Sequence, residues 1–64
     1  MEFVYLFTFG NEWEDSIIIL SKEEAIKQSI DYPKNRVEIF SKIYTNRYVP
    51  TYNYYQNGIL IQNT

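Results

Sequence analysis

The N-terminal segment is the feature that most constrains the fold. Residues Glu2–Phe9 (EFVYLFTF) are dense in β-branched and aromatic side chains, which is typical of a β-strand. Alternation places one apolar set on one face (Val4, Leu6, Thr8) and another on the opposite face (Phe3, Tyr5, Phe7, Phe9). Because both faces are apolar, we expect this strand to lie inside a sheet, or to turn one face toward a partner chain.

A helix is expected near the middle of the chain. The run Ser21-Lys22-Glu23-Glu24 is a capping-box sequence, and it predicts a helix over Lys22–Ile30. Pro33 ends this helix, because the residue before a proline is disfavoured in helical geometry. The apolar spacing directs three residues toward the sheet, namely Ala25, Ile26 and Ile30.

The remaining segments read as strands and turns. After a turn at residues 10–15, Ser16–Leu20 is expected to pair with the first strand in an antiparallel hairpin. Arg36–Tyr44 is a third strand, followed by a turn at Thr45–Arg47.

The chain ends in a predicted hairpin. Tyr52–Gln56 and Ile59–Ile61 flank Asn57-Gly58, the sequence favoured by a type I′ turn. Pro50 indicates that the approach to this hairpin lies at a sheet edge.

Together these elements predict a single α+β domain over residues 1–64. Residues 1–43 form a ββαβ core, and residues 44–64 form a Tyr/Asn-rich segment with the C-terminal β-hairpin. We expect a small antiparallel β-sheet of four to five strands with one helix packed on a face.

Composition excludes most catalytic chemistry. The 64 residues include no cysteine and no histidine, which removes disulfides, thiolate metal sites and the usual proton shuttle at neutral pH. Without histidine the serines lack the usual activating base, so no enzyme activity, metal or cofactor is expected. The net charge of −2 does not favour nucleic acid, and no segment has the length and charge pattern of a membrane span or signal peptide. The expected location is therefore cytoplasmic.

The first candidate binding region is rich in tyrosine. It contains Arg47 and five tyrosines: Tyr44, Tyr48, Tyr52, Tyr54 and Tyr55. Tyrosine combines a large apolar area with a hydroxyl, which explains its enrichment in protein interfaces. Three interpretations remain open: the rings cover a thin sheet, they form a protein-binding surface, or they stack on a nucleotide whose phosphate contacts Arg47.

The second candidate is the acidic loop around the single tryptophan. Glu12, Glu14 and Asp15 surround Trp13. This loop could be a recognition tip in which an aromatic anchor is flanked by charges that select a basic partner. In the other interpretation, Trp13 folds back over the core and the carboxylates solubilise the loop.

The first two thirds of the chain resemble a group of very short phage and bacterial accessory proteins. The resemblance covers residues 3–43 and rests on Val4-Tyr5, on the turn Gly10-Asn11-Glu12-Trp13-Glu14-Asp15 and on the helix start Ser21-Lys22-Glu23-Glu24-Ala25. It implies a non-enzymatic, phage-type inhibitor that binds a host defence protein such as a CRISPR nuclease complex. The alternative is a small-ligand binder that sequesters a nucleotide by tyrosine stacking. A homodimer is expected to be possible in either case, because the core is thin.

Overall fold

The computed structural model describes residues 2–63 and shows one helix packed on a five-stranded antiparallel sheet. The elements along the chain are β1 (Phe3–Thr8), the short 3₁₀ helix η1 (Trp13–Asp15), β2 (Ser16–Ile19), α1 (Lys22–Asp31), β3 (Val37–Tyr44), β4 (Arg47–Gln56) and β5 (Ile59–Ile61). The order across the sheet is β2-β1-β3-β4-β5. The expected α+β architecture is confirmed.

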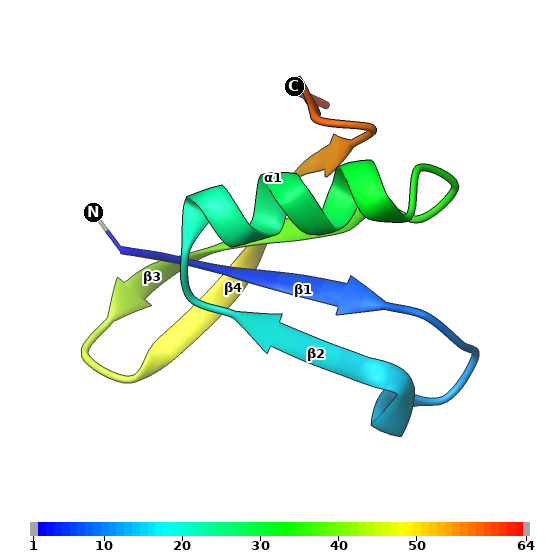
Figure 1. Cartoon of the computed structure of the whole chain (residues 1–64). Coiled ribbons are helices and arrows are strands. Elements are labelled where there is room, and N and C mark those ends of the chain that lie inside the picture. Colours follow the sequence, from blue (N-terminus) through cyan, green and yellow to red (C-terminus); the bar gives the residue numbers. More distant parts are fainter. Residues whose placement is uncertain (1, 64) are drawn as a thin grey trace.

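The position of β1 as an inner strand agrees with its two apolar faces. β1 pairs with β2 on one side and with β3 on the other, both antiparallel. β2 and β3 are therefore parallel to each other, and α1 connects them by crossing one face of the sheet (Figure 1). The face opposite α1 carries no element of the chain between residues 2 and 63, and we call it the open face.

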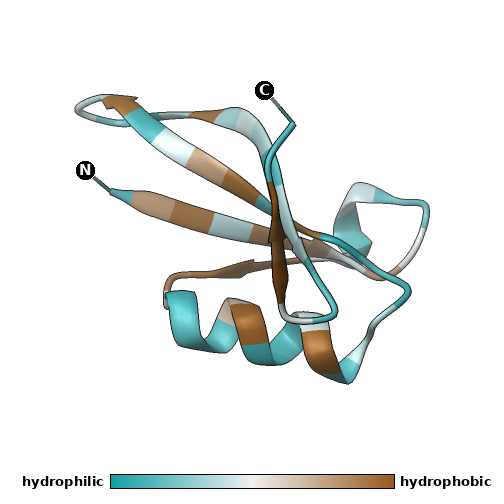
Figure 2. Cartoon of the chain, turned by 90° about the horizontal axis from the view of Figure 1, so that it is seen from above, coloured by the Kyte–Doolittle hydropathy of each residue, from teal (hydrophilic) through white to brown (hydrophobic). Residues whose placement is uncertain are grey.

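The core lies between α1 and the sheet and is small. It consists of six buried hydrophobic residues: Tyr5, Phe7, Ala25, Val37, Ile39 and Tyr55. Ile19 and Ile26 pack against it at the margin. In Figure 2, hydrophobic segments of α1 alternate with hydrophilic ones, as expected for a helix with one buried side.

The prediction that three helix residues face the sheet is wrong for one of them. Ala25 is buried and Ile26 packs on the core, but Ile30 is 52% exposed and lies beside Gly58 in the β4–β5 turn. Ser29 takes the inward position instead and is fully buried. Its hydroxyl donates to the carbonyl of Ile26 (2.7 Å) and accepts from the amide of Gly58 (2.9 Å). These bonds make a polar residue acceptable inside the core.

The ends of α1 follow the sequence signals. The Ser21 hydroxyl accepts from the amide of Glu24 (3.4 Å) and donates to the carboxylate of Glu23 (3.1 Å). The helix ends at Asp31, two residues before Pro33. The type I′ turn is also confirmed, since Asn57 and Gly58 have positive φ angles of 53° and 78° and Gln56 pairs with Ile59.

The start of β4 differs from the prediction. The strand begins at Arg47 and continues through Pro50, whereas the sequence suggested a turn at Arg47 and a strand only from Tyr52. Pro50 pairs with Phe40 of β3, while β5 covers only Tyr54–Gln56 on the other side. The proline is therefore tolerated because β4 is an edge at that position, although β4 is an inner strand farther along.

β4 also contains a bulge that the sequence did not reveal. Between the pairs Phe40–Pro50 and Glu38–Tyr54, three residues of β4 lie opposite Ile39 alone. Tyr52, in the middle of the three, has a φ angle of 67°, a left-handed conformation that is rare for an aromatic residue. Thr51 closes the bulge, because its hydroxyl donates to the carbonyl of Ile39 (2.8 Å) and accepts from the amide of Asn53 (3.1 Å).

Candidate functional site

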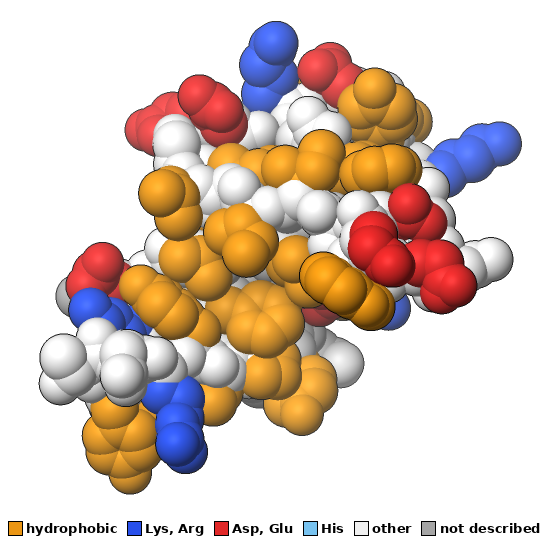
Figure 3. All heavy atoms as spheres, turned by 90° about the horizontal axis from the view of Figure 1, so that it is seen from below, with side chains coloured by type: hydrophobic (Ala, Val, Ile, Leu, Met, Phe, Trp, Pro, Cys, Tyr) orange, Lys and Arg blue, Asp and Glu red, His pale blue; other side chains and the backbone are white. Residues whose placement is uncertain are grey.

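The open face is hydrophobic along its middle. Strand register places Leu6 of β1 beside Ile18 of β2, and Val4 of β1 beside Phe40 of β3. Directly paired residues of antiparallel strands share a face, so these four side chains form one apolar group. Figure 3 views the molecule from this side and shows hydrophobic side chains gathered over much of the surface.

Two depressions hollow this face and join into one surface. The first, of about 280 Å³, is lined by Tyr48 of β4 together with Val4, Tyr5, Leu6, Ile18 and Phe40. The second, of about 370 Å³, is lined by Trp13 and Glu14 of η1 together with Leu6, Ser16 and Ile18. Because Leu6 and Ile18 belong to both, an apolar surface runs without a break from Trp13 to Tyr48. We call it the Trp13–Tyr48 surface.

The conformation of the β1–β2 loop explains the position of Trp13. The amide of Phe9 donates to the carbonyl of Asp15 (2.9 Å), and the amide of Glu12 donates to the Asp15 carboxylate (3.3 Å). Gly10 leaves room for that carboxylate, which a side chain at position 10 would overlap. The loop thus closes on Asp15 and presents Trp13 with 83% of its surface exposed. The interpretation in which Trp13 folds back over the core is wrong.

The charges around the Trp13–Tyr48 surface differ between its two ends. Glu12, Glu14 and Asp15 accompany Trp13 at the η1 end. At the other end, Lys42 of β3 pairs with Tyr48 and donates to the carboxylate of Glu2 (2.9 Å). This hydrogen bond and ion pair lower the pKa of Glu2 and raise that of Lys42.

The structure separates the five candidate tyrosines. Tyr48 lines the open face, whereas Tyr44, next to the β3–β4 turn, and Tyr52, in the bulge, are exposed and line neither depression. Tyr54 is half-buried and lies under the guanidinium of Arg36, at 4.5 Å from its ring centre. Tyr55 is only 6% exposed and belongs to the core.

Arg47, the arginine of the tyrosine segment, lies apart from the cation–π contact of the described residues. Arg47 begins β4, is exposed and pairs in register with Tyr44. The described cation–π contact involves Arg36, which also forms an ion pair with Glu38 (3.3 Å). Trp13 and Tyr48 are therefore the two candidate aromatics that the fold brings to one continuous surface.

The candidate residues chosen from the sequence did not include the apolar middle of this surface. Val4, Leu6, Ile18 and Phe40 connect Trp13 to Tyr48, and only the face of Val4 and Leu6 was expected to be able to meet a partner chain. The available signal was the second apolar face of Glu2–Phe9, because the single helix can cover only one face of the sheet.

Comparisons with known proteins add no assignment: no family model, curated protein or solved structure matches this chain. Among residues 2–63 there is no group of three or more His, Cys, Asp or Glu residues that could hold a metal ion. Within the same residues, no helix is long and apolar enough to cross a membrane.

Proposed function

We propose that this chain is a non-enzymatic interaction protein that docks a partner protein on the Trp13–Tyr48 surface. The observation that carries the proposal is the continuity of this apolar surface across four strands and η1, on a face that α1 leaves open. Contiguous apolar patches of this kind mark interaction sites in soluble domains.

The balance of buried and exposed side chains supports this proposal. Six hydrophobic residues are buried, whereas fourteen large hydrophobic residues of the described chain are exposed. Trp13 and Tyr48 have the chemistry of interface hot spots, since aromatic side chains bury a large area with few rotatable bonds. They lie at opposite ends of an apolar floor, so a partner would fill both depressions at once.

The charges at the η1 end indicate the partner's chemistry. Glu12, Glu14 and Asp15 form an acidic rim beside Trp13. A complementary partner presents an apolar ridge with lysine or arginine next to it, which would steer encounter and fix the orientation. The resemblance to short phage and bacterial accessory proteins extends this proposal to a host protein as target, and to inhibition of a defence protein such as a CRISPR nuclease complex.

The test compares two double variants as baits. Trp13→Ala/Tyr48→Ala removes both ends of the surface, while Leu20→Ala/Ile30→Ala removes two exposed apolar side chains outside both depressions. Circular dichroism first establishes that both variants fold. Each is then used for affinity capture from bacterial lysate, with quantitative mass spectrometry, beside the wild type.

The proposal predicts a stoichiometric protein that wild type and Leu20→Ala/Ile30→Ala retain and that Trp13→Ala/Tyr48→Ala loses. Equal capture by all three baits would show that the partner uses another surface. Sedimentation velocity covers one further case: a concentration-dependent doubling of mass, abolished by Trp13→Ala/Tyr48→Ala, assigns the surface to a second copy of the chain and excludes a host partner there.

A further inference from the structure

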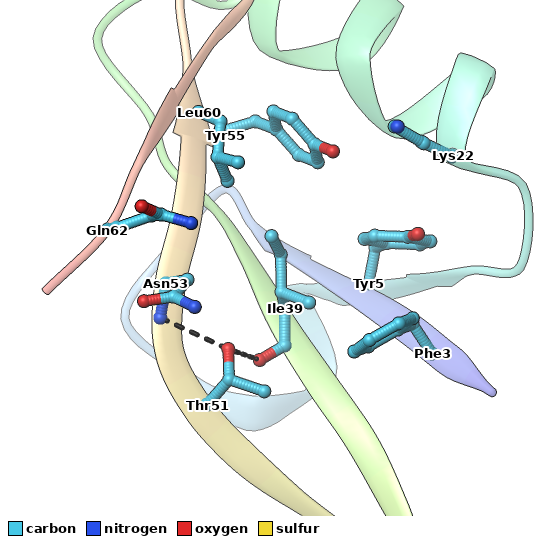
Figure 4. A pocket seen from close by; sticks show the side chains of 9 residues that line it. All are labelled: Phe3, Tyr5, Lys22, Ile39, Thr51, Asn53, Tyr55, Leu60 and Gln62. Carbon is cyan, nitrogen blue, oxygen red and sulfur yellow. Dashed lines mark hydrogen bonds between the residues drawn. The ribbon is translucent and has the colours of Figure 1, made fainter. Parts of the chain in front are cut away.

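A separate cavity lies on the α1 side of the sheet, away from the Trp13–Tyr48 surface. It has a volume of about 250 Å³ and lies between the first residue of α1, β1, the β4 bulge and the C-terminal segment. Figure 4 shows the nine residues that line it: Phe3, Tyr5, Lys22, Ile39, Thr51, Asn53, Tyr55, Leu60 and Gln62.

Two buried tyrosines direct unpaired hydroxyls into this cavity. Tyr5 is 7% exposed and Tyr55 6% exposed, and their ring centres are 6.2 Å apart. Among the hydrogen bonds of residues 2–63, none involves either hydroxyl. No buried side-chain nitrogen or oxygen among these residues lacks a hydrogen-bond partner, so both hydroxyl oxygens reach the solvent-accessible surface of the cavity although their rings are buried. The two hydroxyls are therefore free to bind a molecule in the cavity.

The other polar groups of the cavity are also hydrogen-bond donors. The amino group of Lys22 lies on the same side of the cavity as the two hydroxyls (Figure 4). On the β4–β5 side, the carbonyl oxygen of the Asn53 side chain accepts from the amide of Asn63 (3.0 Å), which leaves its NH₂ group available. The side-chain amide of Gln62 lies next to it, with its nitrogen also toward the cavity (Figure 4).

The β4 bulge holds the amide side of the cavity in place. Thr51 uses its hydroxyl both to donate to Ile39 and to accept from the amide of Asn53, so it fixes Asn53. The left-handed Tyr52 between them is the local strain that this arrangement requires. Bulges and strained residues of this kind concentrate at functional sites.

Burial favours the protonated, hydrogen-bond-donating form of Tyr5. The pKa of Tyr5 is raised above its ordinary value, mainly by burial and further by Tyr55 and Glu23. The hydroxyl therefore remains protonated at neutral pH. Thr51 donates its proton to the Ile39 carbonyl, so the donors that face the cavity are the Lys22 ammonium, the two tyrosine hydroxyls and the NH₂ groups of Asn53 and Gln62.

We propose that this cavity binds a small organic carboxylate. Its oxyanion lies between Lys22 and the hydroxyls of Tyr5 and Tyr55, and an acceptor atom at its other end meets the amides of Asn53 and Gln62. Phe3, Ile39 and Leu60 contact the hydrocarbon body between them. A cavity of ~150 Å³ already holds benzene, so 250 Å³ accommodates one substituted ring.

The test uses para-hydroxybenzoate as a probe on the full chain, followed by nitrogen–proton correlation NMR. The neutral analogue para-hydroxybenzamide has the same shape without the charge. Three variants probe the donors: Tyr5→Phe, Tyr55→Phe and Lys22→Gln. Two matched controls remove the same groups elsewhere, Tyr48→Phe on the open face and Lys27→Gln on α1.

The proposal predicts saturable shifts of the Asn53 and Gln62 side-chain amides with the carboxylate, and binding of the amide weaker by about tenfold or more, because a hydrogen bond to a charged group is lost. Each donor variant should weaken binding by about tenfold for the same reason, while the controls bind as wild type. Absence of shifts at millimolar probe, or equal binding by Tyr55→Phe and wild type, would overturn the proposal. Since the phenylalanine variants keep the rings, a loss of binding with unchanged thermal stability is not a folding effect.

Discussion

The hydroxyl of Ser29 provides a sharp test of how this small domain is held together. It is fully buried and joins α1 to the β4–β5 turn by accepting from the amide of Gly58. Ser29→Ala keeps the backbone bond from Asn57 to the Ser29 carbonyl (3.2 Å) but leaves the Gly58 amide without its acceptor. Such an orphaned amide costs about 1–3 kcal/mol.

Helix propensity acts in the opposite direction. Alanine is better than serine in a helix interior by ~0.5 kcal/mol, so the net loss should be about 0.5–2.5 kcal/mol. For a domain of this size, 1 kcal/mol lowers Tm by roughly 4–8 °C. We therefore expect a Tm reduction of about 2–20 °C for Ser29→Ala.

The assay combines thermal unfolding with hydrogen exchange at the Gly58 amide. Ser16→Ala is the control, because it removes a hydroxyl whose bond to Thr8 (3.2 Å) is exposed, and it should change stability by less than about 0.5 kcal/mol. If Ser29→Ala is as stable as wild type and the Gly58 amide stays protected, the bond contributes nothing and the reasoning is refuted.

Three further perturbations follow from the structure. Gly58→Ala should lower stability by about 1–2 kcal/mol in chemical denaturation, because φ is +78° and the added methyl would meet the side chain of Ile30; an unchanged midpoint would contradict this. Tyr52→Gly should be more stable than Tyr52→Ala by about 1 kcal/mol, since only glycine adopts the left-handed conformation without strain, and equal stability would show that the bulge relaxes. Burial raises the pKa of Tyr5, so its ionisation favours the unfolded chain. The contribution of protonated Tyr5 to the free energy of unfolding should be fully present below pH 10.0, the ordinary pKa, and should be lost as pH rises above it. In pH-dependent melting, Tyr5→Phe should flatten this decline, and an identical decline would exclude Tyr5 as its source.

The sequence predicted the elements whose signals are local. The Ser21 cap, Pro33 and Asn57-Gly58 act over three or four residues, so the ends of α1 and the last turn were predictable. The two apolar faces of β1 predicted a strand inside the sheet or in contact with a partner chain, and the structure places β1 between β2 and β3.

The errors arose where a distant residue decides the outcome. Ser29 is inward because the Gly58 amide, twenty-nine residues away, needs an acceptor. β4 continues through Pro50 because β5 is too short to require a donor there. The bulge at Tyr52 depends on the hydroxyl of Thr51 reaching the carbonyl of Ile39 in a neighbouring strand.

The candidate site was predicted in part for the same reason. Trp13 and Tyr48 carry residue types that indicate recognition, but the sequence did not distinguish Tyr48 from the four other candidate tyrosines. Their placement on one surface depends on Leu6, Ile18 and Phe40, which are assembled by strand order. The cavity on the α1 side of the sheet depends on which tyrosines point toward α1, and the pairing register of β1, β3 and β4 decides this.

The two edges of the sheet limit how copies of the chain could pair edge to edge. Along the outer side of β4, Pro50 and the bulge interrupt the row of hydrogen-bonding groups, and the three-residue β5 covers the rest. The opposite margin is β2, whose sequence Ser16–Ile19 has neither proline nor charge. Unlimited lateral polymerisation needs two receptive margins on each subunit. Because β2 has four residues and the other edge strand, β5, has three, strand addition at either edge would form few hydrogen bonds, which disfavours fibre growth.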